Sequence, residues 1–269
     1  MKPLLFAVGM LIAAGGLSQA RGQDLPTSQP KYLTVYREQV KVGRADAHSK
    51  FEAGYPAALE KAKSPDYYLA LASITGSSEV WYVQPGESYA AVGESMQREA
   101  KDPVLAAELS RLAFTDADYI TSSKVIRARA KPELSIGAFP ELAKARFFEI
   151  STLRIRAGRE MEFEEIAKVY AGIAKRAANA SFRVYEVVAG DRLPTYLIFS
   201  SVGSYAEIDK RVAEGEEAFK KATAEEMATL KKFGDVAETV ESNEFRVDPA
   251  QSYVSKAVRE KDPDFWMAK

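Results

Sequence analysis

Two short stretches decide the fold: Val40-Lys41-Val42-Gly43-Arg44 and Ile155-Arg156-Ala157-Gly158-Arg159. Each lies at the centre of a unit in which an alternating, β-branched segment precedes the glycine and an amphipathic segment follows it. The first unit runs from Tyr32 to Ala62 and the second from Phe147 to Ala177. Matching residues of the two units keep a constant separation, which indicates an internal duplication with a period near one small domain.

The pattern continues in the same order after each unit. Each half next shows a hairpin, a helical segment and a closing strand, so the order β-α-β-β-α-β occurs twice, as in ferredoxin-like folds. The predicted closing strands are 119–130 and 241–247, and one long helix is predicted over 204–232. The expected fold class is α+β, with two tandem ferredoxin-like repeats. Because each sheet has one bare face, the two should form a pseudo-symmetric barrel or pack face to face.

The predicted organisation covers the whole chain. It comprises a signal peptide over 1–22, a linker over 23–31, the first repeat over 32–131, a second linker over 132–144, the second repeat over 145–248 and a tail over 249–269. The tail ends in Phe265-Trp266-Met267, which either frays or docks its apolar tip in a groove.

The composition excludes several classes of function. Lys and Arg total 37 and Asp and Glu 38, so the formal charge is −1 and no basic surface for nucleic acid is expected. The absence of cysteine excludes disulfides, thiolate catalysis and Cys-ligated zinc. With His48 as the sole histidine, no metal site and no cofactor are predicted.

The N-terminus has the features of a secretory signal. Lys2 provides a positive charge, residues 4–17 are apolar or glycine, and Ser18-Gln19-Ala20 suits cleavage. A cut after Ala20 or Gly22 is expected, with export to the periplasm or the exterior and no stable membrane span after processing. The alternative is an uncleaved membrane anchor.

The second unit also carries a family resemblance. The stretch from Phe147 to Gly158 resembles the opening strand of the dimeric α/β-barrel superfamily, and most closely its NIPSNAP branch. That branch ends the strand in Leu-Lys-Pro-Gly, where this chain has Ala157 in place of proline, and Ser151 and Leu153 also depart from its pattern. The resemblance implies a barrel of two ferredoxin-like sheets and leaves a homodimer open. The superfamily includes monooxygenases, haem proteins and lactone isomerases, so the resemblance fixes architecture better than chemistry.

Strand alternation gives a first set of candidate ligand-binding residues. Leu33 and Val35 are matched by apolar residues in the second copy, so this parity is expected to face the helices. Tyr36, Glu38 and, in the second copy, Glu149 should then face the barrel lumen. A carboxylate between apolar walls has a raised pKa and can act as a base, whereas the alternative is a hydrogen-bonded structural glutamate.

Three more residues complete this set. Trp81, on a hairpin strand, could stack on an aromatic ligand or belong to the core. Arg127 and Arg246 are interpreted as equivalent positions on the closing strands, where they could hold a ligand carboxylate or form rim salt bridges. His48 is expected to be a partly buried, neutral structural residue and not a haem ligand, since its counterpart is Phe163.

These observations favour a protein that binds a small molecule in the lumen between the sheets. The alternatives are a cofactor-independent monooxygenase or isomerase in the same cavity, and a structural or partner-binding module that uses its tail. A polar cluster with perturbed acids would favour the enzyme, and a fully packed lumen would favour the module.

Overall fold

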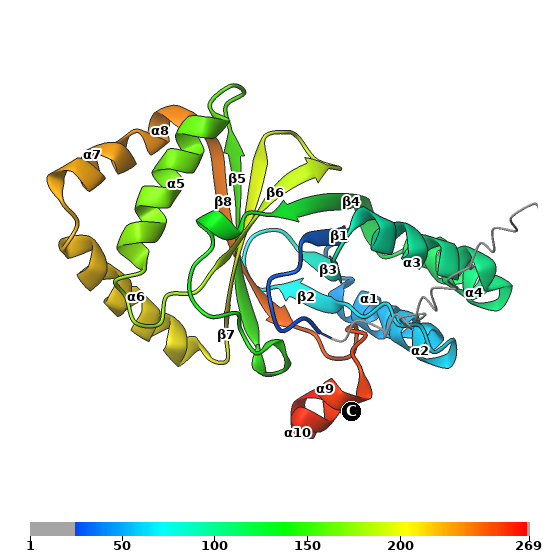
Figure 1. The fold of residues 1–269 in the computed structure, drawn as a ribbon. Helices are drawn as coiled ribbons and strands as arrows, with labels where there is room; N and C mark the ends of the chain where they lie inside the picture. Colours follow the sequence, from blue (N-terminus) through cyan, green and yellow to red (C-terminus); the bar gives the residue numbers. More distant parts are fainter. Residues whose placement is uncertain (1–24, 268–269) are drawn as a thin grey trace, which may run out of the picture.

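The structure is a computed structural model that describes residues 25–267, so the predicted signal peptide lies outside the described residues. Eight strands close into one antiparallel barrel in the order β1-β3-β2-β8-β5-β7-β6-β4. The two groups of repeat helices lie on opposite sides of this barrel (Figure 1). Among the described residues, no helix is long and apolar enough to cross a membrane.

Both halves have the predicted order of elements. The first repeat contains β1 (Tyr32–Val40), α1 (Ala45–Glu52), α2 (Gly54–Lys61), β2 (Leu69–Ser73), β3 (Glu79–Gly86), α3 (Tyr89–Lys101), α4 (Pro103–Asp116) and β4 (Ile120–Ala130). The second contains β5 (Phe147–Ile155), α5 (Glu160–Ala174), β6 (Arg183–Ala189), β7 (Thr195–Val202), α6 (Tyr205–Lys220), α7 (Ala224–Lys231), α8 (Phe233–Val236) and β8 (Ala237–Val247). Two short 3-10 turns, Pro132–Leu134 and Leu142–Lys144, lie between them, and α9 (Lys256–Lys261) and α10 (Pro263–Trp266) form the tail.

Local sequence explains where the helices begin and end. Gly43 and Gly158 both have a positive φ, of 77° and 82°, which lets each first strand turn directly into its helix. The helical segment after Gly43 is interrupted at Ala53, three residues before Pro56, as expected for a ring that removes a helical hydrogen bond. The single helix predicted over 204–232 is instead two helices, α6 and α7, because Thr223 begins a new one with a capping box.

The barrel interior is an apolar core built by both repeats. Its buried side chains include Leu33, Val35, Trp81, Ile126, Phe148, Ile150, Leu197, Phe199 and Phe245. The predicted facing of the first strands was therefore wrong. Leu33 and Val35 point into the barrel lumen, and Tyr36 and Glu38 point toward the helices. In a closed barrel the inner faces of both sheets supply one shared core, so the more apolar of the two alternating sets of side chains points inward.

Little space is left inside the barrel for a ligand. An apolar cavity of about 70 Å³ remains at one end, lined by Leu33, Leu69, Phe148, Phe199 and others. Small-molecule sites usually have several hundred Å³. The lumen is thus a packed core, and the predicted ligand site between the sheets is not supported.

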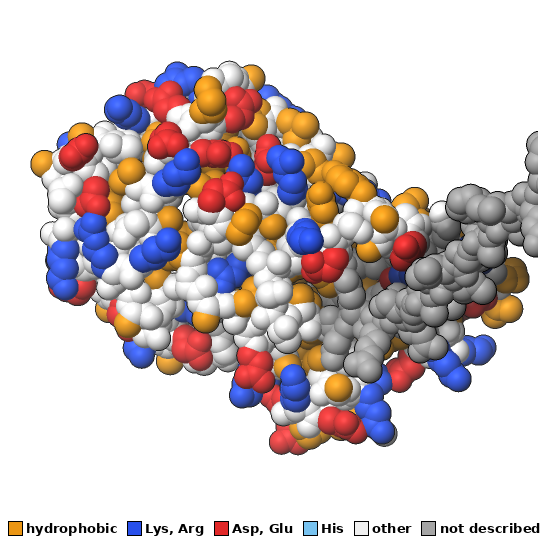
Figure 2. Space-filling view, viewed as in Figure 1, with side chains coloured by type: hydrophobic (Ala, Val, Ile, Leu, Met, Phe, Trp, Pro, Cys, Tyr) orange, Lys and Arg blue, Asp and Glu red, His pale blue; other side chains and the backbone are white. Residues whose placement is uncertain are grey.

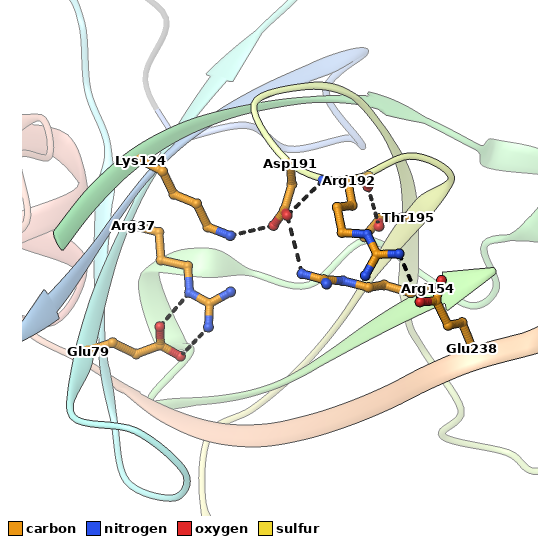
Figure 3. Close-up of polar contacts among 8 residues, drawn as sticks. All are labelled: Arg37, Glu79, Lys124, Arg154, Asp191, Arg192, Thr195 and Glu238. Carbon is orange, nitrogen blue, oxygen red and sulfur yellow. Dashed lines mark hydrogen bonds and ion pairs between the residues drawn. The ribbon is translucent and has the colours of Figure 1, made fainter. Parts of the chain in front are cut away.

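Charged side chains lie inside one end of the barrel (Figure 3). Asp191, in the β6–β7 turn, forms ion pairs with Lys124 of β4 and with Arg154 of β5. Beside them Arg37 pairs with Glu79 and also lies 4.9 Å from the centre of the Trp81 ring. Arg37, Glu79, Lys124 and Arg154 point inward from their strands, so with Asp191 they cover the core where the strands of both repeats meet.

The tail is docked on the barrel, as one of the two readings of its sequence predicted. Trp266 is buried, and its indole N–H donates to the carbonyl of Ala143 at 2.9 Å. Val254 and Val258 join Trp266 in the barrel core cluster. The apolar tip therefore packs against the barrel of its own chain.

Candidate functional site

A cavity of about 320 Å³ lies on the outer face of the first repeat, between its sheet and its helices. We call it the first-repeat cavity. Its lining is Tyr36, Glu38, Glu52, Tyr55, Leu59, Asp66, Tyr68, Tyr82, Gln84, Glu99, Leu109 and Ala113. A neighbouring cavity of about 350 Å³ beneath α3 shares Tyr36, Asp66, Gln84 and Glu99 with it.

Four polar side chains meet at the inner end of this cavity, and we call them the carboxylate–histidine cluster. They are Glu38 from β1, His48 and Glu52 from successive turns of α1, and Asp116 at the end of α4. One ligand-type atom from each lies within 4.8 Å of those of the others. His48 Nε2 lies 3.3 Å from Glu38 Oε2 and 3.4 Å from Asp116 Oδ1, so the imidazole joins strand and helix carboxylates.

The cluster is buried without a compensating cation. Glu52, Asp116 and His48 expose 4%, 3% and 1% of their surface. Within residues 25–267, the ion pairs of these carboxyl groups are with His48 only. Glu52 Oε1 and Asp116 Oδ1 are buried and have no hydrogen-bond partner among the described residues. Such groups are costly to bury and are typical of functional sites.

Burial shifts the protonation of the cluster. Burial, and next the Glu38 carboxylate, raise the pKa of Glu52 to about 9. Burial and Glu38 also raise the pKa of Asp116 to about 6, while His48 acts in the opposite direction. In the protein without a bound cation, Glu52 therefore keeps its proton at neutral pH.

The segment after β8 supports the wall of the cavity. The Tyr82 hydroxyl donates to Gln251 Oε1 at 2.9 Å, and Gln251 Nε2 donates to Asp248 Oδ2 at 2.8 Å. Burial, and next Glu52, raise the pKa of Tyr82 well above its ordinary value, so this phenol stays neutral. The second half of the chain thus fixes a ring that faces the cluster of the first.

The second repeat provides an internal comparison. Glu38, His48 and Glu52 correspond to Leu153, Phe163 and Ala167, counted from the first strand and its glycine. Asp116 lies four residues before β4, as Phe233 lies four residues before β8. These four counterparts pack in one apolar cluster. The fold therefore does not require polar side chains at these positions.

The structure separates the candidates that the sequence had grouped. Glu38 belongs to the cluster and Tyr36 lines the first-repeat cavity, both on the side opposite to the predicted lumen. Glu149 lies on the outer face of the second repeat, where it accepts from Ser242 at 2.9 Å. Trp81 is a core residue, packed between Phe199 and Phe245.

The two arginines are not equivalent, contrary to the sequence interpretation. The first residue of β1 pairs with Arg129 and the first residue of β5 pairs with Arg246, so Arg246 corresponds to Arg129. Because side chains alternate along a strand, a slip of two residues keeps the same face and is invisible in the pattern. Arg127 donates to Thr34 Oγ1 at 3.1 Å and lines the cavity beneath α3, whereas Arg246 is exposed.

Sequence reasoning missed Glu52 and Asp116 and gave His48 only a structural role. His48 is more deeply buried than expected. The spacing of His48 and Glu52 places them on one helix face, which was a usable signal. Asp116, however, is distant in the sequence and joins them only through the packing of α4 on α1. An imidazole and three carboxylates are ligand types that can hold a divalent metal ion.

Comparisons with known proteins identify the fold. No family profile and no curated protein sequence matches the chain. A proposed monooxygenase from Fusobacterium nucleatum subsp. nucleatum is similar in structure, with a TM-score of 0.52 and 13% identity over 81% of this chain and 93% of that chain. A second proposed monooxygenase, from Lactobacillus acidophilus, has a TM-score of 0.50 and 8% identity over 85% of this chain and 100% of that chain.

An anthrone oxidase-like protein has a TM-score of 0.54 and 10% identity over 87% of this chain and 98% of its own. At these identities the likeness concerns the fold, and it does not single out the NIPSNAP branch, which stays a prediction. With the closed eight-stranded sheet and the duplicated β-α-β-β-α-β order, it shows that the chain has the dimeric α/β-barrel fold, with both ferredoxin-like halves in one polypeptide.

Proposed function

We propose that this protein is an enzyme that transfers protons to and from a small organic molecule bound in the first-repeat cavity. The observation that carries the proposal is the lining of that cavity by two carboxyl groups, Glu38 and Glu52, with His48 and Asp116 directly behind them. Acid–base enzymes place carboxyl groups of different protonation state beside one bound substrate.

The two carboxyl groups have different partners and hence different roles. Glu52 is held neutral near pH 7 by burial and by Glu38, so it can donate a proton or a hydrogen bond. Glu38 lies 3.3 Å from His48 Nε2, and it is the group that accepts a proton from the substrate. His48 lines no part of the cavity, so it acts as a positioning residue that orients Glu38.

The walls of the cavity favour a neutral ring compound. Tyr36, Tyr55, Tyr68 and Tyr82 supply aromatic surface, while Glu99, which lines the same cavity, disfavours an anionic substrate. A substrate with an acidic C–H or a phenolic O–H would match these walls and the Glu38 base. The similarity to proposed monooxygenases and to an anthrone oxidase-like protein supports the same class.

Anthrone is therefore a suitable probe. Glu38 would take a proton from the methylene carbon, and the resulting carbanion would be oxidised by O₂. One anthrone and one O₂ then give one anthraquinone and one water. No protein group changes its oxidation state in this balance.

The test is O₂ uptake and anthraquinone formation by the mature chain, compared with Glu38→Gln. Removing a general base should lower the rate about 100-fold or more. Glu108→Gln is the matched control, since Glu108 is an exposed residue of α4 that pairs with Arg111. An unchanged rate in Glu38→Gln, or no rate above buffer in the wild type with anthrone and related phenols and ketones, would reject the proposal.

Binding without reaction is the second candidate, and one observation favours it. The second repeat holds a mainly apolar cavity of about 470 Å³, lined by Phe163, Tyr170, Phe182 and Phe219 among others. An apolar fluorescent probe that binds there, with no turnover of any tested compound, would favour this candidate.

We also propose that the protein is exported. The support is the sequence of residues 1–22, with its positive start, apolar run and small residues before the cut. Export would be consistent with a chain that contains no oxidisable cysteine.

A further inference from the structure

We propose that Glu38, His48, Glu52 and Asp116 bind one divalent metal ion of the manganese or iron(II) type at the inner end of the first-repeat cavity. The inference concerns the occupant of the cluster and does not rest on the proposed reaction: the roles given above to Glu38 and Glu52 are those of the metal-free chain, whereas a bound cation would hold both as deprotonated ligands. It is carried by the geometry of the four side chains, their unpaired atoms and the comparison with the second repeat.

The four side chains already converge at nearly the spacing of a coordination sphere. Their ligand-type atoms lie within 4.8 Å of one another. Opposite ligands of an octahedral site with bonds of about 2.1 Å lie about 4.2 Å apart. Small side-chain movements would therefore bring all four to bonding distance, with the remaining positions open toward the cavity.

Two buried oxygen atoms of the cluster have no hydrogen-bond partner among residues 25–267. Asp116 Oδ1 lies 3.4 Å from His48 Nε2, inside the cluster, and forms no hydrogen bond among the described residues. Glu52 Oε1 is buried and likewise accepts no hydrogen bond from the part of the chain that the structure describes. Buried polar atoms are nearly always satisfied, so two buried oxygens without a hydrogen-bond partner, one of them 3.4 Å from the imidazole, suit coordination to a cation.

The charge balance points in the same direction. The cluster contains three carboxyl groups, and within residues 25–267 no lysine or arginine pairs with them. Glu99 also lines the cavity, whereas the Asp66 carboxylate is paired with Arg98, so Glu99 adds to the potential that favours cations. A divalent ion would offset the buried negative charge directly.

The second repeat shows that these side chains are not needed to build the fold. Leu153, Phe163, Ala167 and Phe233 occupy the corresponding positions and pack as ordinary core. Replacing buried charged groups by apolar ones is often neutral or stabilising. Four polar residues that converge in one repeat only are therefore better explained by a ligand than by stability.

The ligand types narrow the choice of metal. Carboxylates suit magnesium, calcium and manganese, whereas imidazole suits zinc, iron and other transition metals. A ligand set of one imidazole and three carboxylates is intermediate between the preferences of these two classes of metal. Coordination positions open toward the cavity would allow a coordination number above four. Mn²⁺ and Fe²⁺ meet both conditions.

The experiment uses Mn²⁺ with the mature, tag-free chain after removal of bound metals by a chelator. Loss of the free Mn²⁺ electron paramagnetic resonance signal should show one site per chain. Glu52→Gln and Asp116→Asn should each weaken binding by at least about tenfold. Glu108→Gln should bind like the wild type, because Glu108 is an exposed residue of α4 that pairs with Arg111.

A second measurement does not depend on variants that might misfold. His48 is the only histidine in the sequence, so any imidazole nitrogen coupled to bound Mn²⁺ must come from it. Pulsed electron paramagnetic resonance of the wild type should show this coupling. No binding at millimolar Mn²⁺, binding unaffected by both variants, or bound Mn²⁺ without nitrogen coupling would overturn the inference. Anthrone oxidation that persists in chelator alongside such a result would leave the proposed function intact.

Discussion

Glu52 makes the metal-free protein less stable as the pH rises, and Glu52→Gln should remove that loss. The carboxyl group has a pKa of about 9 in the folded chain and an ordinary value of 4.5. Between these values the folded state binds more protons than the unfolded state, so the free energy of unfolding falls with increasing pH. Glutamine keeps the size of the side chain and cannot ionise.

The size of this loss of stability depends on the width of the pH interval tested, and not on the exact pKa of Glu52 in the folded chain. Each pH unit between the two pKa values costs about 1.4 kcal/mol, so the wild type should lose about 3 kcal/mol from this group between about pH 5 and pH 7. Glu52→Gln should therefore become more stable relative to the wild type by about this amount over the same interval. Changes that affect both proteins equally cancel in the difference.

The assay is urea unfolding in the presence of a chelator, followed by the fluorescence of Trp81 and Trp266, which are both buried. Glu108→Gln is the control, and its difference from the wild type should stay constant with pH. If the free energy of unfolding of Glu52→Gln differs from that of the wild type by the same amount at about pH 5 and pH 7, Glu52 is ionised in the folded chain. The assignment of Glu52 as the proton donor would then be wrong.

Four further outcomes are expected. Asp191→Asn should destabilise the protein by about 2 kcal/mol in urea unfolding. Burial raises the pKa of Asp191, but pairing with Lys124 outweighs it and lowers the pKa, so the difference between the variant and the wild type should disappear once the pH falls below that pKa. Trp266→Ala should cost about 3 kcal/mol and make the tail sensitive to protease, and an unchanged digestion pattern would argue against docking. N-terminal sequencing of the mature protein should begin at Arg21 or Gln23, and a product that keeps the first methionine would contradict export. Haemin titration should give no Soret band that depends on His48, because this side chain is enclosed by carboxyl groups; a band lost in His48→Ala would refute this.

The duplication could be predicted from the sequence because it rests on local patterns. Gly43 and Gly158 mark the same turn, and the alternation before them and the helical period after them are short-range signals. The barrel followed from the need to bury two bare sheet faces. Helix boundaries were less accurate where a cap, such as Thr223, competes with a continuous helical period.

The facing of the strands could not be settled in the same way. Both parities of β1 contain apolar residues, and only barrel closure decides that Val35 points inward and Glu38 outward. The cluster was harder still. Asp116 meets His48 through the packing of α4 on α1, a contact that no pattern within either helix reveals. On the face shown in Figure 2, positive and negative side chains are interspersed, so the surface charge there gives no indication of a buried acidic site either.

The two repeats together show how one fold can carry both a stable core and a reactive site. In the second repeat, Phe163 and Phe233 fill the space between helices and sheet, and that half contributes a conventional hydrophobic cluster. In the first repeat, His48 and Asp116 occupy the same places and require charge compensation that apolar packing cannot give. The shared barrel core and the docked tail stabilise both halves at once, since the chain closes one sheet through both repeats. A destabilising acidic site can thus persist in one half because the other half, through the common barrel, holds the fold.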